Sequence, residues 1–243
     1  MKRLAVIPAR GGSKRIPDKN IKDFCGRPMI AHAIKIAQQT GLFTTIHVST
    51  DSSAIVSAAA EYGCAPDFER PADLANDHAS MMETVCYVVE EYERRGETFD
   101  SVILLYTTSP LTDPEDIKRA CAAFEQSDRE KAYLAVTPFP APIEHAFRLK
   151  NNADLVPNDE KALVNRTQDL SHAYYDAGMF AIYGADYVKN SHKAGNFMAF
   201  KGYEVPSYRV TDIDWPEDWD RAQALYKALN LLSTQNEADN ERL

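Results

Sequence analysis

Residues 3–17 read RLAVIPARGGSKRIP, an apolar run that leads directly into a glycine-rich, basic turn. The run is too short for a signal peptide or a membrane span, and Pro8 interrupts it, so we interpret residues 3–8 as a buried strand. In open α/β sheets, ligands bind beyond the carboxyl ends of the strands. The turn after Pro8 is therefore the first candidate for a binding site.

Short apolar runs alternate with segments of helical period along the rest of the chain. This alternation predicts an α/β fold with a mainly parallel, Rossmann-like sheet flanked by helices. The 243 residues suit a single domain spanning 1–243. Expected strands are 3–8, 45–50, 101–106 and 132–136, and expected helices are 29–39, 53–62, 80–95, 114–126 and one that starts near Trp215.

Three prolines in residues 138–142 forbid a regular helix and indicate an exit from the main sheet. We expect residues from about 139 to about 200 to form an insertion that contains another strand at 178–183. The segment 203–213 is predicted to be extended and to return to the core.

The net charge of -9 argues against nucleic-acid binding, because phosphate backbones are held by clustered Lys and Arg. No segment approaches the roughly 18 apolar residues that span a bilayer, so no membrane partner is expected. The four cysteines include no C-x-x-C pair, which disfavours a zinc site or a disulfide framework. A reducing cytoplasm is the expected location.

The segment 10–20 combines Gly11 and Gly12 with the cations Arg10, Lys14 and Lys19 immediately after a strand. Glycines let backbone N–H groups approach phosphate oxygens, and the cations neutralise phosphate charge. Neither the P-loop pattern nor the dinucleotide pattern G-x-G-x-x-G is present. The segment indicates a phosphate-binding loop, and the alternative is a solvated glycine turn.

Asp212 and Asp214 flank Ile213 at the end of the predicted extended segment. Since the side-chain period of a strand is two, both carboxylates would share one face. Mg²⁺ prefers oxygen ligands and is commonly held by one or two carboxylates together with substrate phosphates and water. The pair is a candidate magnesium site, and the alternative is a set of acidic residues that favour the start of the following helix.

Together these motifs resemble the acylneuraminate cytidylyltransferase family over nearly the whole chain. The stretches that carry the resemblance are IPARGGSKRIP (7–17), KNI (19–21), GRPMI (26–30), VSTD (48–51), RP (70–71) with Leu74, Ala75 and Asp77, TSPL (108–111) and DID (212–214). The resemblance implies a nucleotidyltransferase of mixed α/β fold that forms a homodimer through an inserted arm.

Carried over by position, the resemblance implies roles for individual residues. The implied CTP-binding residues are Ala9, Arg10, Gly11, Gly12, Ser13, Lys14, Lys19, Asn20, Arg70 and Ser80. Asp212 and Asp214 would hold Mg²⁺, and Arg10, Lys14 and Lys19 would join them in catalysis. An acidic sugar needs a cation for its carboxylate, for which we expect Arg166, with Tyr106, Gln168 and Asp176 reading the ring substituents.

The expected reaction joins CMP, from CTP, to the anomeric hydroxyl of an acidic nine-carbon sugar. Sialic acid synthetases usually have Gln at the position of Tyr106 and Arg-Pro-Asn-Gly at the position of residues 175–178. The stretches 166–170, 175–178 and 208–214 are instead similar to the pseudaminic acid branch, which has His and Gln in place of Tyr175 and Met179. Legionaminic acid, N-acetylneuraminic acid and Kdo remain alternatives, as does a non-catalytic nucleotide-binding regulator.

Overall fold

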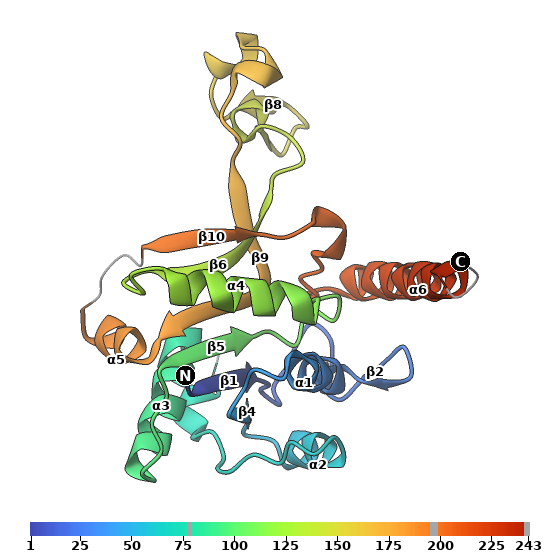
Figure 1. Ribbon diagram of the computed structural model, residues 1–243. Helices are drawn as coiled ribbons and strands as arrows, with labels where there is room; N and C mark the ends of the chain where they lie inside the picture. The colour runs from blue at the N-terminus through green and yellow to red at the C-terminus, as the bar shows by residue number, and fades with distance from the viewer. Residues whose placement is uncertain (77–78, 195–198, 241–243) are drawn as a thin grey trace.

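The computed structural model describes residues 1–76, 79–194 and 199–240, and its centre is a six-stranded sheet (Figure 1). In spatial order the strands are β10 (Phe200–Glu204), β6 (Ala132–Pro138), β9 (Tyr174–Gly184), β5 (Ser101–Leu105), β1 (Arg3–Pro8) and β4 (Thr45–Ser49). Strand β9 is antiparallel to both of its neighbours, and the other pairings in this sheet are parallel. The predicted mainly parallel α/β fold is confirmed.

Strand β1 explains why this sheet is covered on both faces. Leu4 and Val6 point into one apolar cluster and Ala5 and Ile7 into the other, and all four residues are fully buried. Strands that are buried on both faces are apolar without interruption, which is the pattern of residues 4–7. The sheet therefore lies between two layers of helices.

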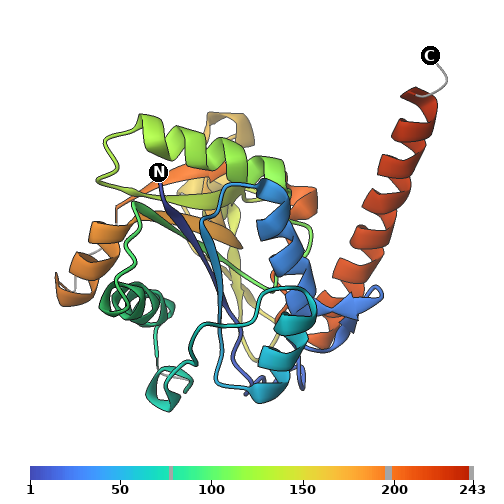
Figure 2. The same ribbon diagram turned by 60° about the horizontal axis from the view of Figure 1, so that its bottom comes forward.

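Five of the helices form these two layers (Figures 1 and 2). One layer contains α1 (Met29–Thr40), α2 (Ser53–Glu61) and α4 (Pro114–Gln126), and the other contains α3 (Met81–Arg94) and α5 (Ala185–Ala194). Helix α4 begins as the sequence predicts, because Asp113 caps its N-terminus and Pro114 occupies the first turn. No helix among the described residues is both long enough and apolar enough to cross a bilayer.

Helix α6 (Pro216–Asn240) packs on the body through its first turns and then points away from it (Figure 2). Trp219 and Ala222 are buried against Phe24. Phe24 is the last residue of β2 (Asp23–Phe24), which forms a short hairpin with β3 (Arg27–Pro28). Further along the helix, Leu231 and Leu232 are 67% and 56% exposed.

Residues 139–173 leave the sheet and form a projecting arm (Figure 1). The arm contains the small hairpin of β7 (Phe147–Leu149) and β8 (Leu155–Pro157). The expected insertion covered about 139–200 and contained a strand at 178–183. In the structure this strand, β9, is longer and belongs to the central sheet, so the part that leaves the sheet ends at Ala173.

The segment 203–213 is not a continuous extended strand. Strand β10 ends at Glu204, a 3-10 turn covers Ser207–Arg209, and Asp212 and Asp214 lie in an irregular stretch before α6. The prediction of a strand at these aspartates is wrong, because Pro206 cannot donate to a sheet ladder and the chain turns there. The predicted alternation of buried and exposed side chains is nevertheless present at residues 212–214, since Ile213 is fully buried and the aspartates on either side of it are not.

Candidate functional site

A cavity of about 400 Å³ lies where β1, β4 and β5 end, which is the edge of the sheet that the sequence indicates. Its walls bring together seven of the predicted site residues, Arg10, Ser13, Lys14, Lys19, Asn20, Arg70 and Tyr106. Pro8, Arg15, Met81, Thr107 and Thr108 complete the lining. Cations dominate this lining, so the cavity suits an anionic ligand in a chain that is acidic overall.

Two backbone hydrogen bonds fix the start of the loop that forms the cavity floor. Ala9 N–H donates to Ser49 O at 2.9 Å, and Gly11 N–H donates to the Asp51 carboxylate at 2.9 Å. A Cβ on Gly11 would lie only 2.9 Å from the Ser52 Cβ, so glycine is required by close approach. Gly12 has no atom within 4 Å of such a Cβ, which leaves its backbone open to a ligand.

Asn20 ties the loop to the end of β5. Its amide nitrogen donates to Arg10 O at 3.0 Å, and its side-chain oxygen accepts a hydrogen bond from the Thr107 hydroxyl at 2.8 Å. The residue is only 6% exposed. Because both hydrogen-bonding groups of this side chain have protein partners, Asn20 holds the shape of the loop as well as lining the cavity.

Arg70 lines the cavity, and the segment that precedes it is hydrogen-bonded to α3. Its guanidinium donates to Ser49 O at 2.7 Å and to the Ser49 hydroxyl at 3.1 Å. Upstream, the Tyr92 hydroxyl donates to Asp67 at 2.5 Å. The pKa of Arg70 is lowered to about 10, mainly by burial; Asp51 opposes the shift and Arg10 adds to it. Bound phosphate would relieve the cost of holding this charge in the protein.

Lys19 reaches across the cavity to the segment that carries the acidic pair. Its ammonium donates to Ile213 O at 2.8 Å and lies 3.6 Å from the Asp214 carboxylate. Burial lowers the pKa of Lys19, against the attraction of Asp214 and Asp212. Arg15, which was not among the predicted site residues, pairs with Asp214 at 2.8 Å. The basic loop and the acidic pair thus form one site.

The second carboxylate, Asp212, lies beside Thr108 in the turn that follows β5 and beside Gly178 in β9. It makes a hydrogen bond with Thr108, and a Cβ added to Gly178 would lie 3.4 Å from its Cγ. Surrounding protein displaces water from the carboxyl group and raises the pKa of Asp212, and Asp214 raises it further. A nearby cation would reverse this penalty.

The residues at this point fit a hard divalent cation. Asp212 and Asp214 flank the buried Ile213, and the charge of Asp214 raises the pKa of Asp212, so a cation shared by the two carboxylates would relieve their repulsion. The part of the chain that the structure describes contains no cluster of three or more His, Cys, Asp or Glu arranged for a metal. Water and substrate phosphates would therefore complete the coordination.

Tyr106 and Asp176 mark the end of the site that faces β9. Burial raises the pKa of Tyr106 to about 12, and the charges of Asp176 and Asp212 contribute to the shift. Asp176 accepts a hydrogen bond from Gly178 N–H at 2.8 Å. These neighbours place two candidate sugar-binding residues beside the acidic pair.

Three predicted site residues lie elsewhere. Ser80 caps α3, where its hydroxyl accepts from Glu83 N–H at 3.2 Å, and its side chain does not line the cavity. Arg166 and Gln168 lie on the exposed arm, and Arg166 pairs with Asp169 at 2.8 Å (Figure 1). Within one chain, Arg166 and Gln168 do not line the cavity. Asp77 lies outside the described residues.

Comparison with known proteins identifies relatives over almost the full length. The family described as cytidylyltransferase matches residues 4–239. The "Pseudaminic acid cytidylyltransferase" of Campylobacter jejuni subsp. jejuni serotype O:23/36 (strain 81-176) is 38% identical, with 93% of this chain and 97% of the relative covered. The "CMP-N,N'-diacetyllegionaminic acid synthase" of Legionella pneumophila subsp. pneumophila (strain Philadelphia 1) is 32% identical, with coverage of 90% and 94%.

A solved structure of CMP:2-keto-3-deoxy-manno-octonic acid synthetase, complexed with CTP, has a similar fold. Its TM-score is 0.72 at 20% sequence identity, and the match covers 94% of this chain and 99% of that one. At this identity the likeness concerns the arrangement of the sheet and helices.

Proposed function

This chain belongs to the cytidylyltransferase family, and we propose that it transfers CMP from CTP to the anomeric hydroxyl of a nonulosonic acid, releasing pyrophosphate. The observation that carries the proposal is the joining of Arg10, Lys14 and Lys19 to the Asp212–Asp214 pair in one site at the sheet edge. A polyanionic substrate held with a divalent cation needs both halves of such a site.

Pseudaminic acid is the proposed sugar. Two relatives named as pseudaminic acid cytidylyltransferases are 38% and 37% identical to this chain, against 32% for the relative named for legionaminic acid. Tyr106 and Asp176, which lie beside the acidic pair, are the proposed readers of the sugar ring. Legionaminic acid is the second candidate because its synthase also matches along most of the chain.

In the proposed reaction the sugar hydroxyl attacks the α-phosphorus of CTP, and the bond to the β-phosphate oxygen breaks. Negative charge accumulates on the departing pyrophosphate, where Arg10, Lys14 and Lys19 offset it. Asp212 and Asp214 are the proposed Mg²⁺ ligands, and Mg²⁺ would supply charge neutralisation to the phosphates when bound. Arg70 would hold the nucleotide in place from the buried side of the cavity.

A homodimer is proposed as the functional unit. Several large apolar side chains of the arm face solvent, including Leu149 at 72% and Val164 at 84% exposure. Exposed apolar groups on a projecting hairpin are typical of a surface that a second copy covers. In such a dimer the arm would carry Arg166 and Gln168 to a sugar held by the other chain.

A cytoplasmic location is also proposed. Cys25, Cys64, Cys86 and Cys121 are all free thiols in the structure, and thiols persist in reducing compartments.

The test is to follow pyrophosphate release with CTP, Mg²⁺ and a panel of pseudaminic acid, legionaminic acid, N-acetylneuraminic acid and Kdo. We expect the highest kcat/KM with pseudaminic acid and loss of turnover when Mg²⁺ is chelated. Turnover of no nine-carbon acid would refute the proposal. If CTP bound without pyrophosphate release, the result would support a regulator built on this fold.

A further inference from the structure

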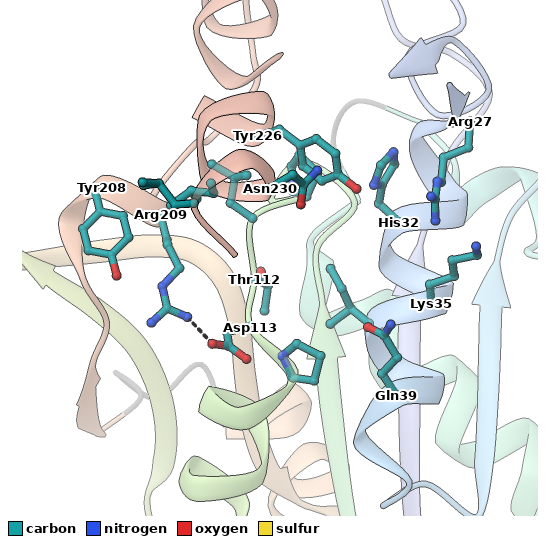
Figure 3. Close-up of a pocket in the computed structure, with 16 residues that line it drawn as sticks. Arg27, His32, Lys35, Gln39, Thr112, Asp113, Tyr208, Arg209, Tyr226 and Asn230 are labelled. Atoms are coloured by element: carbon teal, nitrogen blue, oxygen red, sulfur yellow. Dashed lines mark hydrogen bonds and ion pairs between the residues drawn. The ribbon is translucent and has the colours of Figure 1, made fainter. Parts of the chain in front are cut away.

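A second cavity, of about 720 Å³, lies between α1, the start of α4, the turn at Ser207–Arg209 and α6 (Figure 3). It shares no lining residue with the nucleotide cavity. Its volume falls in the range of roughly 300–1,000 Å³ that is usual for small-molecule sites. None of the roles derived above uses it.

The cavity carries an excess of positive charge. Arg27, Lys35 and Arg209 line it; Arg209 is paired with Asp113 at 2.7 Å and with Asp116 at 2.9 Å, so the excess positive charge is that of Arg27 and Lys35. Arg27 and Lys35 are half-buried, and neither has a carboxylate within 4 Å in the part of the chain that the structure describes. Partly buried charge without an opposite charge is costly, so an anion between these cations would be stabilised.

The remaining lining suits the ring of a polar ligand. Tyr208 and Tyr226 present aromatic rings, and Gln39 and Thr112 contribute amide and hydroxyl groups (Figure 3). His32 donates from Nε2 to Phe24 O at 2.8 Å, which leaves Nδ1 as an acceptor. Aromatic faces, neutral hydrogen-bonding groups and paired cations are the requirements of a nucleotide site.

Two chain segments connect this cavity to the nucleotide cavity. The first is residues 107–114, in which Thr107 and Thr108 line the nucleotide cavity and residues 110–114 line the second one. The second is residues 208–214, which run from Arg209 to Asp212 and Asp214. A ligand that moved the Arg209–Asp113 pair would therefore act on Thr108 and Asp212, which are hydrogen-bonded to each other.

We propose that the second cavity binds a CMP-bearing molecule and that its occupation slows turnover at the nucleotide cavity. The choice of CMP rests on the proposed function, because a CMP-sugar is the product class of that reaction. The site then makes the enzyme respond to the level of its own product, through a ligand that need not displace CTP.

The test uses CMP as the probe and the double variant Arg27→Glu with Lys35→Glu. In isothermal titration without metal, we expect two binding events per chain for the wild type and one for the variant, with the affinity of the lost event reduced at least about tenfold. The control is Arg94→Glu with Lys118→Glu, which makes the same change of charge at exposed positions outside both cavities. The control should retain both events.

Steady-state kinetics with CTP as the varied substrate test whether occupation of the second cavity slows turnover. CMP should inhibit the wild type by a mixed pattern and the double variant competitively, with basal kcat and KM for CTP changed less than about twofold because neither residue lines the nucleotide cavity. Competitive inhibition of both proteins with one constant, or two binding events in the double variant, would overturn the proposal.

The two proposals fail separately. A wild type with a single CMP site that disappears in the double variant supports the second cavity, and the role of the Arg10 loop is then decided by pyrophosphate release from CTP. A single site that survives in the double variant contradicts the second cavity alone. Thermal melts of all three proteins verify that each is folded.

Discussion

The loop at residues 9–20 and the arm at residues 139–173 both follow a strand of the central sheet, yet they are held in different ways. The loop is fixed from the body by Asn20, by Asp51 and by the Arg15–Asp214 ion pair, and Ile16 is 2% exposed. The arm is held by contacts of its own residues, such as Arg148 with Asn158 at 3.0 Å, and Val164 is 84% exposed.

This difference indicates which parts of the site one chain completes by itself. The phosphate end has its cations, its carboxylates and its supporting hydrogen bonds within one chain. The arm displays large apolar side chains that are exposed, and its candidate sugar-binding residues, Arg166 and Gln168, do not line the cavity. Changes in the body should therefore alter chemistry or folding, whereas changes in the arm should alter association.

The largest expected effect is in the body, at Asp212. Asp212→Asn should lower kcat by about 10²–10³-fold, because the amide keeps the shape but removes charge from the acidic pair. Its thermal midpoint should stay the same or rise, since the raised pKa of Asp212 means that its ionised form is disfavoured in the folded state. Pyrophosphate release and a calorimetric scan measure the two quantities.

Asp186→Asn, an exposed substitution in the first turn of α5, is the matched control and should leave kcat unchanged. If Asp212→Asn kept the wild-type kcat, Asp212 would not be a catalytic residue, and the expected effect of the body on chemistry would be contradicted.

A smaller effect is expected from the arm. Leu149→Ser with Val164→Ser should weaken self-association by roughly ten- to a hundredfold, because both side chains offer apolar area to a second copy. The free energy of unfolding of the isolated chain should change by no more than about 0.5 kcal/mol, as is usual at exposed positions. Sedimentation over a concentration series gives the first quantity and urea unfolding at low protein concentration the second. A wild-type chain that is monomeric at all concentrations would contradict the dimer.

A separate effect concerns acid stability, which should depend on the two buried histidines of the body, His32 and His47. Burial lowers the pKa of His32 and of His47 to about 4, and His47 stacks on Phe68. The unfolded chain takes up these protons near pH 6.5, so stability is fully present above that pH and falls as pH drops toward 4. Each histidine contributes at most about 3 kcal/mol to this loss.

Unfolding free energies at pH 7 and pH 4.5 measure the loss. His32→Gln and His47→Asn keep the donor positions of the two rings, and each should reduce the difference between the two pH values. His172→Gln, on the exposed part of the arm, is the control and should not change it. An equal effect of all three variants would show that burial is not the cause.

Local pattern predicts the body of the fold well. The strand at 3–8 and the helix at 114–126 have the predicted bounds, because an uninterrupted apolar run and an Asp-Pro start are strong local signals. The break at Glu204 and the antiparallel direction of β9 are not local properties, since they depend on which strands meet in the sheet. The segment 203–213 was predicted as extended although Pro206 is a local signal against a strand, and the chain turns at Ser207–Arg209.

The candidate site divides in the same way. Arg10, Lys14 and Lys19 follow a strand end directly, so their common location could be predicted from position alone. Arg15 as partner of Asp214 depends on a tertiary contact that spacing does not reveal, whereas the cap formed by Ser80 is a local feature. A Ser-x-x-Glu pattern at Ser80 was the available signal for the cap.

Strand β9 has a mechanical consequence for the whole molecule. It runs from the base of the arm into the middle of the central sheet, and its pairing with β6 shifts register between Asp176 and Ala181, where Gly178 has a φ of 60°. Gly178 lies beside Asp212, so a displacement of the arm would reach this carboxylate through the strand. If a second copy bound the arm, both ends of β9 would be held in place. Dimerisation would then make the active site more rigid without contributing a residue to it.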